Sequence, residues 1–144
     1  MPNSIYIGRQ PIFDRSGEIY AYELLFRTKS TVAIHIEDDL IATVRVLINA
    51  LNNIGTKSLL NGKIGFINVD RSLVMSEMIE LVPKEAFVLE ILESCTLDEE
   101  FLSRIKQLRK IGYTFALDDF DGSKKMFAQF DKLFEHVSIC LLYT

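Results

Sequence analysis

The chain has 144 residues, of which 49% are hydrophobic, and its formal net charge is −4 at pH 7. This size and apolar content predict a single globular domain with its own core, and the acidic balance excludes a nucleic-acid polymer as the expected partner, because surfaces that bind such polymers are normally basic. No apolar run reaches the ~20 residues that cross a bilayer and the first residues lack a signal-peptide pattern, so we expect a cytoplasmic protein without a membrane partner.

Two strand-like segments open the chain, at residues 5–13 and 18–26. The turn-forming residues between them, 14–17, predict an antiparallel hairpin. In the second segment, the alternation of side chains along a strand puts Glu23 on the same, mostly apolar face as Ala21. A carboxylate in that position predicts either an ion pair with a nearby base or a functional role.

Helices and strands then alternate. Apolar residues at helical spacing predict a helix from about residue 37 to 54, ended by Gly55. A buried strand follows at 63–69, with Asn68 near its carboxyl end, and Asp70 is placed to cap a short helix before Pro83.

The second half repeats this alternation. Its predicted elements are a strand at 86–92 interrupted by Glu90, a helix with a capping box at 96–99 and an end at Gly112, a strand at 113–118, a helix starting near Ser123, and a strand at 137–142. Strands separated by helices imply right-handed crossovers and a parallel sheet. The sequence therefore predicts an α/β fold.

Polar residues interrupt the apolar pattern near four successive strand ends: Glu23, Asn68, Glu90, and the adjacent pair Asp118 and Asp119. In parallel α/β folds, functional groups collect at the carboxyl ends of the strands. Carboxylate and amide oxygens are the ligands that Mg²⁺ and Mn²⁺ prefer, and two such ions can stabilise the attacking and leaving oxygens of phosphoester hydrolysis. This pattern predicts metal-dependent phosphodiester hydrolysis.

Each of these residues also has a structural explanation, such as an ion pair, a turn or a helix cap, and one of the two aspartates could cap the helix near Ser123. Other chemistries have less support. The sequence has no glycine-rich phosphate loop after a strand and no GxSxG motif, His35 and His136 lie outside the strand-end set, and a glycosidase fits the asparagine and paired aspartates less well.

Four motifs in order resemble one family. Residues 10–27 read QPIFDRSGEIYAYELLFR, and FINVD, LEILES and ALDDFDGS follow. They resemble the EAL domain of cyclic di-GMP phosphodiesterases, in the divergent form found in bacterial signalling proteins that add a C-terminal HDOD domain. The resemblance implies a partial TIM-like (β/α) barrel with an N-terminal antiparallel hairpin, truncated after about the fifth strand, so that residues 1–144 form the N-terminal portion of a single EAL-like domain.

The resemblance also implies roles for individual residues. It assigns the binding of Mg²⁺ or Mn²⁺ to Glu23, Asn68, Glu90, Asp118 and Asp119. It assigns catalysis to Glu23, Asp118 and Asp119. It assigns cyclic di-GMP binding to Gln10 and Arg27. The intact parent protein is thus expected to hydrolyse cyclic di-GMP to the linear dinucleotide.

Three departures from the family pattern argue against activity in this chain. Leu141 stands near the position of the family's lysine, Asp121 replaces the first glycine of DDFGTG, and the family's later acids would lie beyond Thr144. We therefore expect this chain to be inactive; the alternative is a catalytically degenerate EAL module that serves as a cyclic di-GMP-binding or protein-interaction scaffold. Unclosed barrel edges further predict a homodimer.

Overall fold

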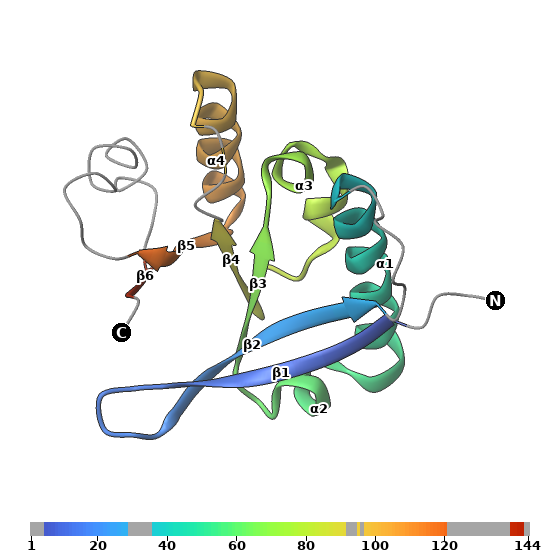
Figure 1. The fold of residues 1–144 in the computed structure, drawn as a ribbon, viewed down its shortest axis with the longest axis vertical. Coiled ribbons are helices and arrows are strands. Elements are labelled where there is room, and N and C mark those ends of the chain that lie inside the picture. Colours follow the sequence, from blue (N-terminus) through green and yellow to red (C-terminus); the bar gives the residue numbers. More distant parts are fainter. Residues whose placement is uncertain (1–4, 29–35, 92–94, 96, 121–138, 143–144) are drawn as a thin grey trace.

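The structure is a computed structural model and describes residues 5–28, 36–91, 95, 97–120 and 139–142 (Figure 1). Side chains are described for residues 7–25, 44, 45, 47–91, 95 and 97–117. The elements in chain order are β1 (Ile5–Phe13), β2 (Ile19–Thr28), α1 (Ile36–Ile54), α2 (Thr56–Leu60), β3 (Ile64–Val69), α3 (Arg71–Met75), the 3₁₀ helix η1 (Glu77–Leu81), β4 (Phe87–Ile91), α4 (Glu99–Ile111), β5 (Thr114–Phe120) and β6 (Ile139–Leu142).

The described strands form one six-stranded sheet in the order β1-β2-β3-β4-β5-β6. Strand β1 is antiparallel to β2, and every later pairing is parallel. This confirms the predicted hairpin and the predicted partial α/β barrel, in which β2 to β6 supply five parallel strands. The turn end of the hairpin extends away from the described helices, whereas its other end lies beside α1 and α2 (Figure 1).

Asp14 fixes the hairpin turn. Its Oδ1 accepts hydrogen bonds from the Ser16 hydroxyl at 2.7 Å and from the backbone N–H groups of Ser16 at 2.9 Å and Glu18 at 3.0 Å. These bonds favour the charged carboxylate, and the Ser16 hydroxyl bond contributes most to lowering the pKa of Asp14. Gly17 has a φ of 82°, which a residue with a side chain rarely adopts, so the turn needs glycine there.

The helix ends agree with the predicted caps except at the start of α4. Asp70 caps α3 as predicted, with its Oδ1 accepting from the Leu73 N–H at 2.8 Å, and Gly112 ends α4 with a φ of 123°. The capping box at 96–99 was wrong: α4 begins at Glu99, and Asp98 is its cap, accepting from the Phe101 N–H at 2.8 Å. Both Thr96 and Asp98 are good cap types, so local sequence alone did not choose between them.

Two short helical segments were not predicted as such. Helix α2 follows α1 directly after Gly55, and the expected single short helix before Pro83 is divided into α3 and η1. Ser76 separates these two, and its hydroxyl accepts from the Met78 N–H at 3.1 Å. The predicted helix near Ser123 lies outside the described residues.

The sheet has two unlike faces. One face, here called the helix-packed face, carries large apolar side chains that pack with the described helices, among them Leu24, Leu89 and Phe115. The other, here called the inner face, carries the buried cluster of Ala21, Phe66, Val88 and Ala116. Residues of alternate parity on the same strands supply the two faces, as the period of two in a strand requires.

The helix-packed face is tightly filled. Gly65 on β3 is buried, and a Cβ atom at this position would lie 2.6 Å from Cε1 of Phe87 and 2.9 Å from Cδ2 of Leu60. Only a glycine allows this close approach.

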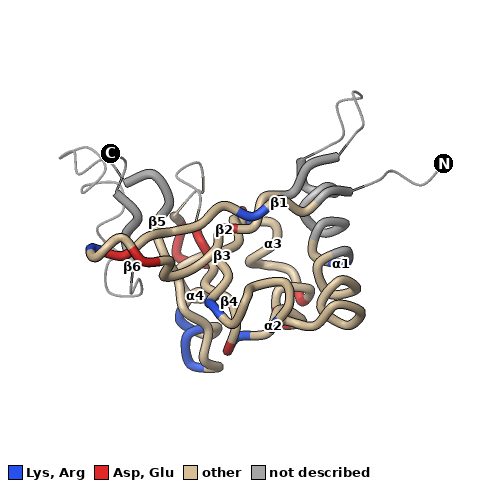
Figure 2. Tube along the Cα trace, turned by 90° about the horizontal axis from the view of Figure 1, so that it is seen from below, with Lys and Arg blue, Asp and Glu red and all other residues tan. Residues whose placement is uncertain are grey.

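Figure 2 shows a basic stretch along α4, where Arg109 and Lys110 occupy the last turn and suit the negative end of the helix dipole.

None of the described helices combines the length and the apolar character that a bilayer crossing requires.

Candidate functional site

Sheet register brings Asn68 and Glu90 together. They are directly paired positions on the neighbouring parallel strands β3 and β4. Glu23 on β2 pairs with Phe66, which lies two residues before Asn68 on β3. Paired residues, and residues two apart on one strand, share a face of the sheet. Three of the predicted site residues therefore occupy the inner face, on three adjacent strands.

The residues assigned to substrate binding lie on the hairpin. Gln10 on β1 is the register partner of Glu23 and is exposed. Arg27 pairs with Tyr6 towards the carboxyl end of β2, and its side chain lies outside the described part. The antiparallel hairpin thus puts Gln10 beside the candidate metal ligand, although the two are 13 positions apart in the sequence.

Glu90 is 0% exposed and is the only charged residue among the described side chains that is buried. Its Oε1 atom is buried without a hydrogen-bond donor in the described part of the chain, although Glu90 as a residue does have an interaction partner. Removing a carboxylate from water is costly unless cations or hydrogen-bond donors compensate. A fully buried carboxylate does not serve apolar packing, which makes Glu90 a candidate for a polar or metal-binding role.

The aspartate pair falls at an irregularity of β5. Glu90 pairs with Ala116, and Asp118 follows two residues later along the strand. Leu117 pairs with Cys140 on β6, whereas Phe120 pairs with Leu142, so the register shifts across Asp118 and Asp119. A strand with one extra residue loses strict alternation, and such bulges often occur beside active sites, where they redirect side chains. The side chains of both aspartates lie outside the described residues.

The donor set fits a hard divalent cation. Among the described side chains, no three or more of the histidine, cysteine, aspartate and glutamate type come together; Asn68 is of another type, and the side chains of Asp118 and Asp119 are not among those described. The metal-ligating atoms that Glu23, Asn68 and Glu90 can offer are all oxygens: two carboxylates and the amide oxygen of Asn68. Oxygen-only sets suit Mg²⁺, Mn²⁺ and Ca²⁺ rather than softer metals.

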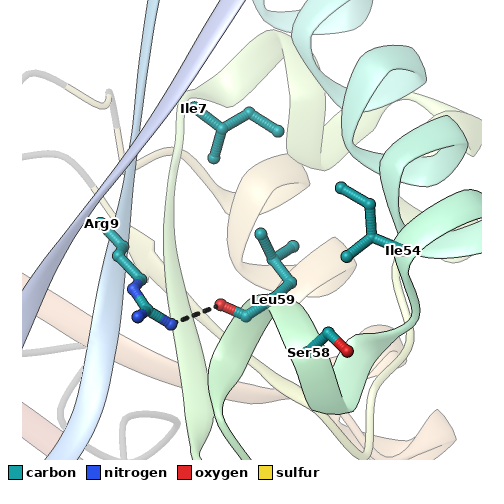
Figure 3. Close-up of a pocket in the computed structure, with 5 residues that line it drawn as sticks. All are labelled: Ile7, Arg9, Ile54, Ser58 and Leu59. Carbon is teal, nitrogen blue, oxygen red and sulfur yellow. Dashed lines mark hydrogen bonds between the residues drawn. The ribbon is translucent and has the colours of Figure 1, made fainter.

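Sequence reasoning missed Arg9. Its guanidinium carbon lies 4.5 Å from the centroid of the Tyr22 ring, and its Nη1 donates to the backbone oxygen of Leu59 at 3.1 Å (Figure 3). Arg9 also lines a shallow pocket with Ile7, Ile54, Ser58 and Leu59. The hydrogen bond joins residues 50 positions apart, so no local pattern could have revealed it.

Comparison with known proteins gives two curated relatives, while no family model matches. The chain is 39% identical over 116 residues to the uncharacterized protein YuxH of Bacillus subtilis (strain 168), covering 81% of this chain and 28% of that protein. It is 32% identical over 117 residues to the cyclic di-GMP phosphodiesterase CdgJ of Vibrio cholerae serotype O1, covering 80% of this chain and 27% of that protein. The chain thus spans less than a third of either relative.

Solved structures share the fold. The Bacillus subtilis YkuI protein, which has an EAL domain and was solved with cyclic di-GMP and calcium, matches with a TM-score of 0.63 at 19% identity, over 87% of this chain and 38% of that one. The EAL domain of Mycobacterium smegmatis DcpA matches with a TM-score of 0.57 at 21% identity, over 94% and 61%. The chain therefore has the EAL-type fold, which confirms the resemblance seen in its motifs. The link to an HDOD domain stays a prediction.

Proposed function

We propose that this chain is part of a bacterial cyclic di-GMP signalling protein and that the strand ends on its inner face bind cyclic di-GMP through divalent cations. One observation carries the proposal: Asn68 and the fully buried Glu90 are paired on adjacent parallel strands, with Glu23 on the same face of the next strand. Carboxylate and amide oxygens on such a row suit a hard cation better than an apolar core.

In this proposal Glu23, Asn68, Glu90, Asp118 and Asp119 hold Mg²⁺ or Mn²⁺. A bound divalent ion neutralises phosphate charge and lowers the pKa of a bound water. The names of two similar proteins support this assignment, because one is a cyclic di-GMP phosphodiesterase and the other was solved with cyclic di-GMP and calcium.

The remaining residues orient the substrate. Gln10 lies opposite Glu23 and is exposed, which supports a role for its amide in hydrogen-bonding a ligand beside that carboxylate. Arg27, four residues after Glu23, supplies a planar guanidinium that suits bidentate binding of a phosphate. We infer hydrolysis to the linear dinucleotide for the intact parent. For this chain we infer binding without turnover, because Leu141 stands near the position at which the family has a lysine.

Calorimetric titration of the purified chain with cyclic di-GMP, with and without Mn²⁺, tests the proposal, followed by chromatography of the nucleotide. We expect binding that requires Mn²⁺, is lost in Glu90→Gln and Asn68→Ala, and persists in the matched control Glu18→Gln, whose side chain is exposed just before β2. No binding under either condition would overturn the proposal.

Two other outcomes would revise it. Metal-independent binding that survives Glu90→Gln would instead favour the degenerate, scaffold-type EAL module. Appearance of the linear dinucleotide would overturn the inference that this chain lacks turnover.

A further inference from the structure

The strand that carries Glu23 is joined to the parallel part of the sheet by a short ladder. The β2–β3 register covers three residue pairs, Ala21 to Glu23 against Ile64 to Phe66, whereas the β3–β4 register covers five. Glu23 is therefore the last residue of β2 that is paired with β3. A slip of one residue would turn its side chain to the opposite face, so the position of Glu23 depends on the β1–β2 pairing as well as on this short ladder.

Arg9 supplies contacts at this point. It lies next to Gln10 on β1, and Tyr22 lies next to Glu23 on β2, while Gln10 and Glu23 are register partners. The Arg9 guanidinium packs over the Tyr22 ring, 4.5 Å from its centroid. It also donates to the backbone oxygen of Leu59 of α2 at 3.1 Å (Figure 3). The contact between Arg9 and Tyr22 is thus on the helix-packed face, directly behind the Gln10 and Glu23 pair on the inner face.

We propose that Arg9 is a positioning residue that ties the β1–β2 hairpin to α2 and so holds Gln10 and Glu23 in place for metal and nucleotide binding. This inference rests on the proposed function. Arg9 itself is exposed and reaches the site only through Tyr22 and the strand backbone. A cation over an aromatic face combined with a hydrogen bond to a carbonyl fixes both the direction and the distance of the guanidinium.

If Arg9 acted on global stability alone, a variant without its guanidinium would have a lower unfolding temperature. Tyr22 is 7% exposed and belongs to the large core that also contains Leu24. Removing an exposed guanidinium leaves that core intact, so the unfolding temperature should change little. The position of Glu23 should change more. Loss of an outer contact that orients a metal ligand typically lowers metal affinity by about 10- to 100-fold.

The experiment compares Arg9→Ala, Arg9→Lys and the control Arg15→Ala, whose side chain is exposed in the hairpin turn. Mn²⁺ affinity is measured by calorimetry, and amide hydrogen exchange is measured along β1 and β2. We expect Arg9→Ala to weaken Mn²⁺ binding about tenfold and to speed exchange in β2 at an unchanged unfolding temperature. Arg9→Lys should restore much of both, since an ammonium can also lie over the ring and donate to Leu59. The control should match the parent chain.

Unchanged exchange in Arg9→Ala would overturn the inference, as would unchanged Mn²⁺ affinity in a parent chain that binds the ion. An equal loss of Mn²⁺ affinity in all three variants, the control Arg15→Ala included, would also overturn it. If the parent chain binds no Mn²⁺, the proposed function fails separately, and the exchange measurement alone still decides whether Arg9 fixes the hairpin.

Discussion

The two faces of the sheet differ in what their side chains can contribute. The helix-packed face pairs large residues such as Leu89 and Phe115 with helices and buries them fully. The inner face holds a small apolar cluster and then, at the strand ends, Glu23, Asn68 and Glu90 in place of further apolar side chains. Burial on the first face stabilises the fold, whereas polar groups on the second reduce the apolar area that can be buried. Under the proposed function, stability and binding are thus assigned to opposite faces of the sheet.

The largest expected effect is on the helix-packed face. Phe115→Ala removes a side chain that is 0% exposed, and we expect the free energy of unfolding to fall by about 3–5 kcal/mol. Urea denaturation followed by circular dichroism measures the change. Phe13→Ala is the matched control, because Phe13 is 59% exposed and its loss should change stability by no more than about 0.5 kcal/mol. Equal effects of the two changes would contradict the assigned core.

Close packing on the same face gives the next largest effect. Gly65→Ala places a methyl group 2.6 Å from the buried Phe87 ring, and we expect a loss of about 1–3 kcal/mol in the same denaturation experiment. Gly8→Ala is the control, since a Cβ there would meet no atom closer than 3.7 Å. A neutral Gly65→Ala would mean that the β3–β4 region relaxes easily.

The inner face should respond less strongly. Glu90→Gln keeps the size of the buried side chain and one of its two oxygen atoms, so without metal we expect the free energy of unfolding to stay within about 1 kcal/mol of the parent. Denaturation in the presence of a chelator measures this. A loss of more than about 2 kcal/mol would show that Glu90 belongs to a structural network and would remove the contrast between the faces.

The smallest expected effect is a pH dependence away from both faces. The N–H of Phe101, and then Arg71 at 2.8 Å, lower the pKa of Asp98 from its usual 3.8. A carboxylate whose pKa is lower in the folded state stabilises the fold above the unfolded pKa, and this contribution is lost as the pH falls through the folded value. Asp98→Asn retains a good cap type but not the charge.

We therefore expect the parent chain to exceed Asp98→Asn in unfolding temperature at pH 6 and the difference to shrink as the pH falls below about 3.8, the usual pKa of the group. Thermal unfolding at several pH values provides the measurement, with Glu99→Gln on the same helix as the control. A constant difference between parent and variant across this range would contradict the assignment.

Local patterns in the sequence determined the kinds of elements and the positions of the strand ends. Period-two and helical spacing placed the hairpin, α1 and the parallel strands, and the preferences of Asp70 and Gly112 placed two helix ends. These features depend on residues a few positions apart, which is why a single sequence reveals them. Where two neighbouring residues could both cap α4, the same reasoning selected the wrong one.

Tertiary structure decided the features that join distant residues. The pairing of Asn68 with Glu90, the complete burial of Glu90, the approach of Phe87 to Gly65 and the contact of Arg9 with Leu59 each depend on how strands and helices from separate parts of the chain meet. Register and packing are set by the sum of many long-range contacts, which no local spacing encodes. The sequence by itself determined which residues stand at the strand ends; only the assembled sheet decided which of them lie side by side.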